Sequence, residues 1–175
     1  EKVEDIKEKY KQLIQGLPVA VYTCDAQGYV EIYNETAVEL WGVKPEIGKD
    51  LWCGSWKIYK PDGSPLPLEE CPMALSINKG RSVSFEIVIE RPDKTRRTII
   101  PNPQIIRDGD GNIIGAINTL IDITPQVVAR KKIEESEQSI RTLVENAPFP
   151  IGVYEGEELR ITLANQAIMD IWGKG

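Results

Sequence analysis

Two segments of this chain, about 130 residues apart, repeat nearly the same pattern. Residues 2–18 read KVEDIKEKYKQLIQGLP and align without a gap with residues 132–148, which read KIEESEQSIRTLVENAP. Two shorter matches follow: PVAVY at 18–22 with PIGVY at 150–154, and NETAVELWG at 34–42 with NQAIMDIWG at 165–173. Because this period is far longer than that of a solenoid repeat, it indicates a duplicated domain in which each copy follows its own helix. The sequence therefore predicts one complete copy and the start of a second, as in a longer tandem array.

The composition argues against several classes of function. The chain has 27 acidic and 21 basic side chains, and its net charge of −6 argues against nucleic acid as a direct partner. Histidine is absent, which removes the usual proximal haem ligand and the commonest general base. No apolar run reaches the roughly 20 residues that cross a bilayer, and no signal peptide opens the chain. We therefore expect a cytoplasmic segment without membrane contact, although the complete protein can be membrane-attached.

Three cysteines, Cys24, Cys53 and Cys71, occur without C-x-x-C spacing. Their odd number and their spacing predict neither a disulfide framework nor a zinc site. Reduced thiols, as in a cytosolic protein, are the simplest interpretation. We expect no metal site, and no nucleophile and base occur at a spacing that would predict catalysis.

Each copy follows an amphipathic helix whose apolar residues alternate at intervals of three and four. This spacing is the a/d pattern of a coiled coil and predicts the seam of a homodimer. The seam residues are Val3, Ile6, Tyr10 and Leu13 in the first helix and Ile133, Ile140 and Leu143 in the second. Since two heptads are few for a coiled coil, the alternative in which such a helix folds back on its own domain stays open.

Between these helices, alternating apolar residues predict strands and capping residues predict helices. We expect a hairpin over residues 19–33, a helix from Asn34 to Gly42, a helix over 68–79, and strands over 83–90, 95–106 and 113–121. Pro101 and Pro103 predict a bulge or an edge-like stretch within the second of these strands. The order indicates an α+β fold with one five-stranded antiparallel sheet and its helices inserted after the first hairpin.

This element order resembles that of the PAS domain family. The resemblance includes Asn34 opening the first helix, Gly42 closing it, Gly115 in the last strand, and Asp122 and Thr124 at the end of that strand. It implies the PAS fold, flanked by N-terminal and C-terminal coiled-coil-like helices. The corresponding boundaries are 1–17 for the N-terminal helix, 18–124 for a complete PAS domain, 125–147 for a linker helix and 148–175 for the start of a second PAS domain.

The residues after the last strand also have a physical interpretation of their own. Thr124 can cap a helix that begins at Pro125. In PAS proteins of similar sequence, the residues that match Asp122 and Thr124 couple distortion of the sheet to the following helix, and the resemblance implies this signal relay here. An ordinary helix start is equally compatible with the sequence. Downstream, Ser136 is the one polar residue of the second seam, which either favours a switch of helix register or is a tolerated small residue.

A small-molecule pocket between the sheet and its helices is one interpretation that stays open. Its candidate residues are Tyr22, Trp41, Trp52, Trp56, Asn102, Gln104, Asn118 and Thr119. The polar ones can equally satisfy one another or point outward. The segment around Cys53 reads GKDLWCG and lacks the Asn-Cys-Arg-Phe-Leu-Gln motif of flavin-binding photosensory PAS domains. Histidine-ligated haem is excluded, so the cofactor stays unknown and none is required.

The resemblance implies a sensory module of two-component signal transduction. Such a module relays a ligand or conformational signal through the helical linker to a downstream histidine kinase in the same chain. Two alternatives stay open: a ligand-free dimerisation spacer, and the input domain of a cyclic-dinucleotide enzyme or a transcription regulator. The segment itself is expected to be non-enzymatic.

Overall fold

The computed structural model describes residues 2–173 and gives side chains from residue 8 onward. The chain forms two compact units, residues 1–125 and residues 126–175. The first holds the region predicted as the complete domain, and the second holds most of the linker helix and the segment after it. Within the described residues, no helix combines the length and the apolar character that crossing a membrane requires.

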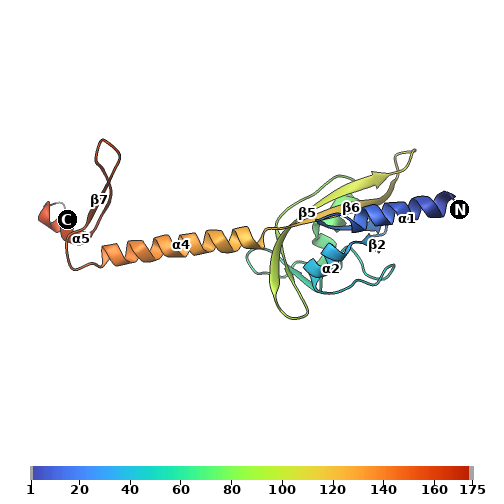
Figure 1. Cartoon of the computed structure of the whole chain (residues 1–175), viewed down its shortest axis with the longest axis horizontal. Coiled ribbons are helices and arrows are strands. Elements are labelled where there is room, and N and C mark those ends of the chain that lie inside the picture. Colours follow the sequence, from blue (N-terminus) through green and yellow to red (C-terminus); the bar gives the residue numbers. More distant parts are fainter. Residues whose placement is uncertain (1, 174–175) are drawn as a thin grey trace. The chain divides into compact units, whose positions relative to one another are not determined.

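One antiparallel sheet of six strands organises the first unit (Figure 1). Its spatial order is β2-β1-β6-β5-β4-β3, so the first strand lies between its hairpin partner and the last strand. The strands are β1 (Ala20–Asp25), β2 (Val30–Tyr33), β3 (Lys57–Tyr59), β4 (Ile87–Glu90), β5 (Arg96–Arg107) and β6 (Ile113–Asp122). The helices are α1 (Lys2–Gln15), α2 (Glu35–Trp41) and α3 (Pro72–Lys79), with a 3-10 turn at Leu68–Glu70. As predicted, α2 and α3 follow the first hairpin.

Alternate residues of the strands pack against α2 and α3 to form the core. Tyr22 of β1 and Trp41 of α2 meet edge to face, with ring centroids 5.1 Å apart. Both are almost fully buried, as are Met73 of α3, Ile89 of β4 and Ile99 of β5. Burial of one such side chain stabilises the fold by about 1.5–3 kcal/mol. Only strand residues that point to this inner face can therefore line an interior site.

Helix α2 begins and ends where the sequence predicts. The side chain of Asn34 accepts a hydrogen bond from the Ala37 amide, and Gly42 closes the helix with a φ of 68°. A left-handed residue at this position favours glycine. A Cβ at Gly42 would also lie 3.0 Å from the side chain of Arg91, which packs against the end of the helix.

The sheet has six strands, and the prediction of five is wrong by one. The additional strand, β3, pairs Lys57 with Glu90 and Tyr59 with Val88 of β4. It is three residues long, which is too short to show an alternating pattern in the sequence. Its position depends on tertiary contacts, among them Arg96, whose guanidinium carbon lies 4.4 Å from the centre of the Tyr59 ring.

Two predicted boundaries are wrong for local reasons. The helix expected over residues 68–79 is divided at Cys71, because the residue before a proline disfavours the helical conformation. The strand expected from Val83 begins only at Ile87. The Val83 amide donates to the Ser76 hydroxyl at 2.8 Å, which holds this segment against α3 instead of in the sheet.

Strand β5 contains the two prolines that predict an edge-like stretch. β4 pairs with β5 only over residues 96–99, so Pro101 and Pro103 lie beyond its end and have a partner strand on one side only. A residue without an N–H is tolerated there because no second ladder requires its donor. The Ser84 hydroxyl donates to the Pro101 carbonyl at 2.6 Å and covers the other side.

Helix α1 contacts the domain with one face, and the described residues of its predicted seam are exposed. Ile14 is buried, and the Gln15 side chain donates to the Tyr33 carbonyl at 2.7 Å. The seam residues Tyr10 and Leu13 are exposed. The side chains of two further seam residues lie outside the described part of the structure: Val3 and Ile6. The helix therefore folds back on its own domain while the described part of its seam stays free.

The second unit repeats the opening of the first. Its elements are α4 (Thr124–Glu145), whose first two residues belong to the first unit, β7 (Gly152–Glu155), β8 (Arg160–Ala164) and α5 (Gln166–Ile171). β7 and β8 form an antiparallel hairpin in which Gly152 pairs with Ala164. The side chain of Asn165 accepts from the Ile168 amide and caps α5, as Asn34 caps α2. The order strand, strand, capped helix is thus the same in both units.

Candidate functional site

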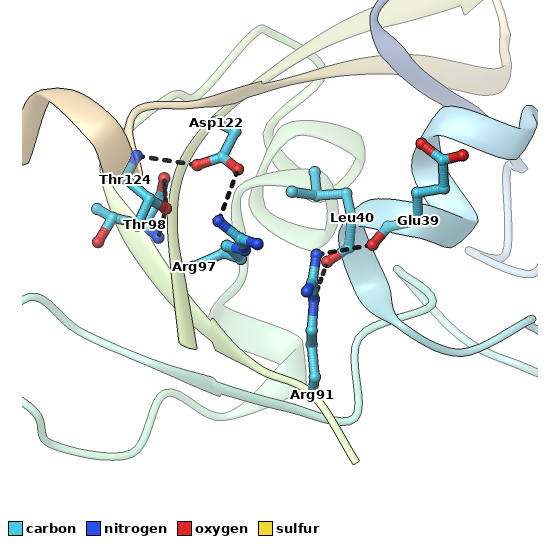
Figure 2. Close-up of polar contacts among 7 residues, drawn as sticks. All are labelled: Glu39, Leu40, Arg91, Arg97, Thr98, Asp122 and Thr124. Carbon is cyan, nitrogen blue, oxygen red and sulfur yellow. Dashed lines mark hydrogen bonds and ion pairs between the residues drawn. The ribbon is translucent and has the colours of Figure 1, made fainter. Parts of the chain in front are cut away.

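The end of β6 and the start of α4 are joined to β5 by a short hydrogen-bonded network (Figure 2). The regular ladder between β5 and β6 ends at the pair Ile99–Asp122. Beyond that pair, the Ile123 amide donates to the Thr98 carbonyl at 2.9 Å. The Thr98 amide in turn donates to Thr124 Oγ1 at 2.8 Å. The Thr124 side chain of α4 thus takes the place of the backbone carbonyl that would accept the next hydrogen bond in the β5–β6 ladder.

This network differs from the helix cap that the sequence predicts. Asp122 Oδ1 accepts from the Thr124 amide at 2.9 Å. Thr124 Oγ1 bonds Thr98 of β5 and makes no capping bond to an amide of the first helical turn among the described residues, and the helix begins at Thr124 itself. Asp122 therefore fastens the helix start to β6, and Thr124 fastens it to β5.

Arg97 extends the network toward the solvent. Its Nη1 lies 3.9 Å from Asp122 Oδ2, and the two side chains are 37% and 33% exposed. An ion pair of this length and exposure contributes about 0–1 kcal/mol to stability. The Nε of Arg97 is buried and has no hydrogen-bond partner among the residues that the structure describes. The pair therefore adds little to the stability of the fold, and the bond from the Thr124 amide is the contact that holds the Asp122 carboxylate.

Arg91 connects the same end of the sheet to α2. Its Nε donates to the Leu40 carbonyl at 2.9 Å and its Nη2 to the Glu39 carbonyl at 2.7 Å. Carbonyls in the last turn of a helix have no partner within it, and a cation there also interacts favourably with the helix dipole. Figure 2 shows this contact near the Asp122 network. Both border one surface cleft of about 350 Å³, whose lining includes Arg91, Arg97 and Asp122.

The interior between the sheet and the helices is nearly filled. Tyr22 donates its hydroxyl proton to the Trp52 carbonyl at 2.6 Å and accepts from Asn118 Nδ2 at 3.1 Å. Tyr22, Trp41 and Asn118 line a cavity of about 10 Å³. A cavity of that size holds about one water molecule. The packing of these side chains therefore does not fit a group as large as a flavin or a haem.

Two buried polar atoms belong to the residues that line this cavity. Trp41 Nε1 is a donor and Asn118 Oδ1 is an acceptor, and neither has a hydrogen-bond partner among residues 2–173. A buried polar group without a partner costs about 1–3 kcal/mol. These two atoms are therefore candidates for hydrogen bonds with a small molecule in the core.

The remaining predicted pocket residues lie outside the cavity lining. Trp52 lies next to a lining residue, because its carbonyl accepts from the Tyr22 hydroxyl. Four others are also absent from the lining: Trp56, Asn102, Gln104 and Thr119. Successive strand residues point to opposite faces, so Asn102, Gln104 and Thr119 lie on the outer face. The residues beside them that face inward and are buried are Pro101, Pro103, Asn118 and Leu120. Trp56 is exposed in the loop before β3. The prolines of β5 hide this alternation in the sequence.

The three thiols are free, and Cys24 and Cys71 are buried. Burial is the main cause that raises their pKa values: that of Cys71 to about 12, and those of Cys24 and Cys53 above the ordinary value. A raised pKa keeps a thiol protonated at neutral pH and makes it a poor nucleophile. Over the described part of the chain, no three Cys, Asp or Glu side chains are grouped so that they could hold a metal ion.

The predicted seam of α4 is exposed along the helix. Ile133, Ile140 and Leu143 are each more than half exposed, and Ser136 is exposed between them. An apolar row on an exposed helix face is the kind of surface that a second helix covers. The helix therefore carries an apolar stripe that its own unit does not bury.

Sequence patterns do not indicate the contacts of Thr98 and Arg91. The Thr98–Thr124 bond spans 26 residues, and the bond from Arg91 to Glu39 spans 52. Neither contact follows from a local periodicity. The sequence did offer one indication of the first contact. If the pairing of β5 with β6 is extended as far as Asp122, Thr98 lies beside the start of α4.

Comparison with known proteins gives two matches to family models. A model described as PAS domain matches residues 18–125, and another with the same description matches residues 138–175. The first match covers the six-stranded sheet, α2 and α3. The second covers the end of α4, β7, β8 and α5.

Among curated proteins, the chain is similar to the two-component sensor PprA of Pseudomonas aeruginosa. The two are 28% identical over 183 aligned positions, which cover 97% of this chain and 18% of that protein. This chain thus spans less than a fifth of the length of that relative.

Solved structures with a similar fold include PAS and light-oxygen-voltage domains. An RNA-binding light-oxygen-voltage receptor matches 80% of this chain and 39% of its own, with a TM-score of 0.58 and 16% identity. The PAS domain of the fruit-fly ELK potassium channel matches 67% of this chain and 97% of its own, with a TM-score of 0.54 and 13% identity. At these identities the likeness concerns the fold alone, and it agrees with the predicted α+β architecture.

The buried thiol of Cys71 predicts a pH dependence of stability. The unfolded thiol loses its proton near pH 8.5, whereas the folded one keeps it up to about pH 12, so its contribution is complete below pH 8.5 and is lost as the pH rises. Serine at this position does not titrate in that range. The free energy of unfolding of Cys71→Ser should therefore fall by about 2 kcal/mol less than that of the wild type between pH 7 and pH 10.

Urea unfolding at each pH measures this difference. Between pH 6 and pH 7 neither variant titrates at this position, so the two curves should run parallel there. Parallel curves up to pH 10 would contradict the burial assigned to the thiol.

Proposed function

This chain belongs to the PAS domain family, and on that premise we propose that it is a sensory signalling module that relays a conformational signal through α4 to an output domain of the same protein. The observation that carries the proposal is the bond from the Thr98 amide to Thr124 Oγ1, at 2.8 Å. It makes a side chain of the linker helix part of the hydrogen-bond ladder of the sheet. A distortion of β5 at this point therefore displaces the start of the helix.

The proposed output is a histidine kinase of a two-component system. The similarity to the two-component sensor PprA supports this proposal, and the aligned region covers 18% of that protein. A cyclic-dinucleotide enzyme or a transcription regulator is the alternative output, and the relay at Thr124 would be the same for each. The proposal includes the boundaries 18–124 and 148–175 for the two PAS copies, the linker 125–147, a cytoplasmic location, and no catalysis by the segment itself.

The proposed relay needs a second helix against which α4 can move. Ile140 and Leu143 of α4 and Leu13 of α1 are apolar and more than half exposed. A homodimer in which each seam meets its counterpart buries them by symmetry. Ser136 weakens the packing at one level of the seam, and this level is where a change of rotation or register costs least.

A second candidate function, sensing of a small molecule in the core, is favoured by one observation. Trp41 Nε1 and Asn118 Oδ1 are buried without a partner among the described residues, and both residues line the same cavity. A molecule with one donor and one acceptor would satisfy both atoms. The volume of about 10 Å³ limits it to about the size of water unless α2 or α3 moves. In a ligand-free spacer, an ordered water would occupy this place.

The relay is tested with Thr124→Val in the complete protein. Valine keeps the shape of the side chain and removes the acceptor for the Thr98 amide. We expect ATP-dependent phosphorylation on histidine to shift about threefold or more, because coupling energies along such paths are about 0.5–2 kcal/mol. The matched control is Thr142→Val, an exposed residue of α4 whose hydroxyl bonds only the Gln138 carbonyl one turn earlier.

Two results would count against the proposal. Equal phosphorylation in Thr124→Val, Thr142→Val and the wild type would remove the relay role of Thr124. A complete protein without any ATP-dependent phosphorylation on histidine would remove the kinase as the output.

The homodimer is tested with Leu143→Lys in the present chain. Leu143 is 72% exposed in the single chain, so lysine should leave the fold intact while placing a charge in the seam. We expect sedimentation to show a dimer for the wild type and a dissociation constant at least about tenfold higher for Leu143→Lys. Leu159→Lys, in the turn between β7 and β8 and 70% exposed, is the control and should stay dimeric. If the wild type is monomeric at high concentration, the proposed homodimer through this seam is wrong.

A further inference from the structure

The side chain of Asn34 is buried at the place where α1, β1 and α2 meet. Its Oδ1 accepts from the Val21 amide and from the Ala37 amide, each at 3.0 Å. The first bond holds the beginning of β1, and the second caps α2. One carbonyl oxygen therefore fixes a strand of the sheet and a helix of the core to each other.

The amide nitrogen of Asn34 points to the opposite side, toward the end of α1. Nδ2 donates to the Val19 carbonyl at 2.7 Å and lies 3.3 Å from the carbonyls of Ile14 and Leu17. Two N–H groups are thus shared among three acceptors. Ile14 and Leu17 belong to the end of α1 and the turn after it, so the nitrogen fastens the preceding helix to the domain. The exposure of Asn34 is 0%.

The second copy repeats this arrangement with Asn165. Its Oδ1 accepts from the Ile151 amide at 2.8 Å and from the Ile168 amide at 3.1 Å. Its Nδ2 donates to the Phe149 carbonyl at 2.8 Å and to the Ala147 carbonyl at 3.4 Å. The carbonyl of Ala147 follows the end of α4, as that of Leu17 follows the end of α1. Asn165 is only 1% exposed, although most residues of β7 and β8 are exposed. Its burial is therefore local to the junction.

The Asn34 junction lies at the same end of the sheet as the Thr124 network. In the register of β1 against β6, Ala20 pairs with Leu120, two residues before Asp122. The cleft of about 350 Å³ has Val19 and Ala20 in its lining together with Arg97 and Asp122. The helix that enters the domain and the helix that leaves it are therefore attached to neighbouring strands, and the inner cavity is not part of the path between them.

We propose that Asn34 is a positioning residue that receives the movement of the helix entering the first copy, and that Asn165 receives the movement of α4 for the second. The inference rests on the proposed relay and extends it to the input side. α4 is fastened at its start by Thr124 and at its end by Asn165. A rotation of α1 reaches the start of α4 through Asn34, β1 and the end of β6, and a rotation of α4 reaches the next copy through Asn165.

The substitution Asn34→Asp separates the two functions of this side chain. Aspartate retains an oxygen acceptor for the Val21 and Ala37 amides, so β1 and the cap of α2 are kept. It removes the donor to the end of α1 and places an acceptor against the carbonyls there. Gln27→Glu is the control, because it adds the same charge at an exposed residue of the β1–β2 turn.

Residue-resolved amide hydrogen exchange on the 175-residue chain gives the readout. We expect exchange at residues 12–17 to become about tenfold faster or more in Asn34→Asp. The amides of Thr98, Ile123 and Thr124, which Asn34 does not contact, should exchange about threefold faster or more. An anchor that only holds α1 would leave those three amides unchanged. The amides of β3 and β4 and all amides of Gln27→Glu should keep their wild-type rates.

Two results overturn the inference. One is faster exchange at residues 12–17 with no change at Thr98, Ile123 and Thr124. The other is an equal increase at all amides, β3 and β4 included, which would mean global destabilisation. If Asn34→Asp does not fold, Asn34→Ser gives the same test, because serine keeps an oxygen that can cap α2 and removes the amide donor to the end of α1, with the same supporting and contrary results at residues 12–17 and at Thr98, Ile123 and Thr124.

The exchange experiment tests the role of Asn34, and the phosphorylation experiment tests the proposed relay and its output. Either proposal can be wrong while the other holds. A complete protein without histidine phosphorylation removes the proposed output but leaves the exchange pattern of Asn34→Asp to be explained by coupling within the domain. Conversely, Thr124→Val can shift phosphorylation while Asn34→Asp leaves Thr98 and Thr124 unchanged. In that case the relay stands and the role of Asn34 falls.

Discussion

The pairing of β1 with β6 is the interaction on which the rest of the structure depends. Ala20 opposes Leu120 and Asp25 opposes Gly115, so the first and last strands of the domain run side by side along the whole of β1. The close approach leaves no space for a side chain at Gly115, whose Cβ would lie 2.4 Å from the Cys24 carbonyl oxygen. This register brings the end of α1 and the start of α4 to one end of the sheet.

The polar contacts at that end are of unequal strength. The Asn34 side chain and the bond between Thr98 and Thr124 are backbone-directed and buried or half-buried, and such bonds contribute about 0.5–1.5 kcal/mol each. The pair between Arg97 and Asp122 is longer and partly exposed, so it contributes less. The proposed coupling between the two helices is therefore assigned to hydrogen bonds that extend the ladder and not to the ion pair of Arg97.

Features with a local cause could be predicted from the sequence. Asn34 and Gly42 mark the ends of α2 because capping depends on the residue itself. Pro101 and Pro103 correctly indicate an edge-like stretch because their missing donors restrict where they can lie. The break at Cys71 had a local signal as well, in the proline that follows it. Of the candidate pocket residues, Tyr22, Trp41 and Asn118 line one inner cavity, while their role in ligand binding and the relay role of Asp122 and Thr124 stay predictions.

Features that depend on register could not be predicted in the same way. Asn102 and Gln104 were grouped with the inner face because prolines obscure the alternation of β5. Thr119 of β6 was grouped with its neighbour Asn118, although successive strand residues point to opposite faces. β3 is recognisable only once β4 is beside it. The hydroxyl of Thr124 was expected to cap its own helix, and its bond to Thr98 follows only from the point at which the β5–β6 ladder ends. Each of these outcomes is decided by a partner distant in the sequence.

A double-mutant cycle tests the central claim most directly. Urea unfolding of the wild type, Asn34→Asp, Thr124→Val and the double variant gives the coupling free energy between the two side chains, which do not contact each other. The account predicts a coupling of about 0.5–2 kcal/mol, because both act on one end of one sheet. Additivity within about 0.3 kcal/mol would contradict it and would leave the two junctions as independent anchors.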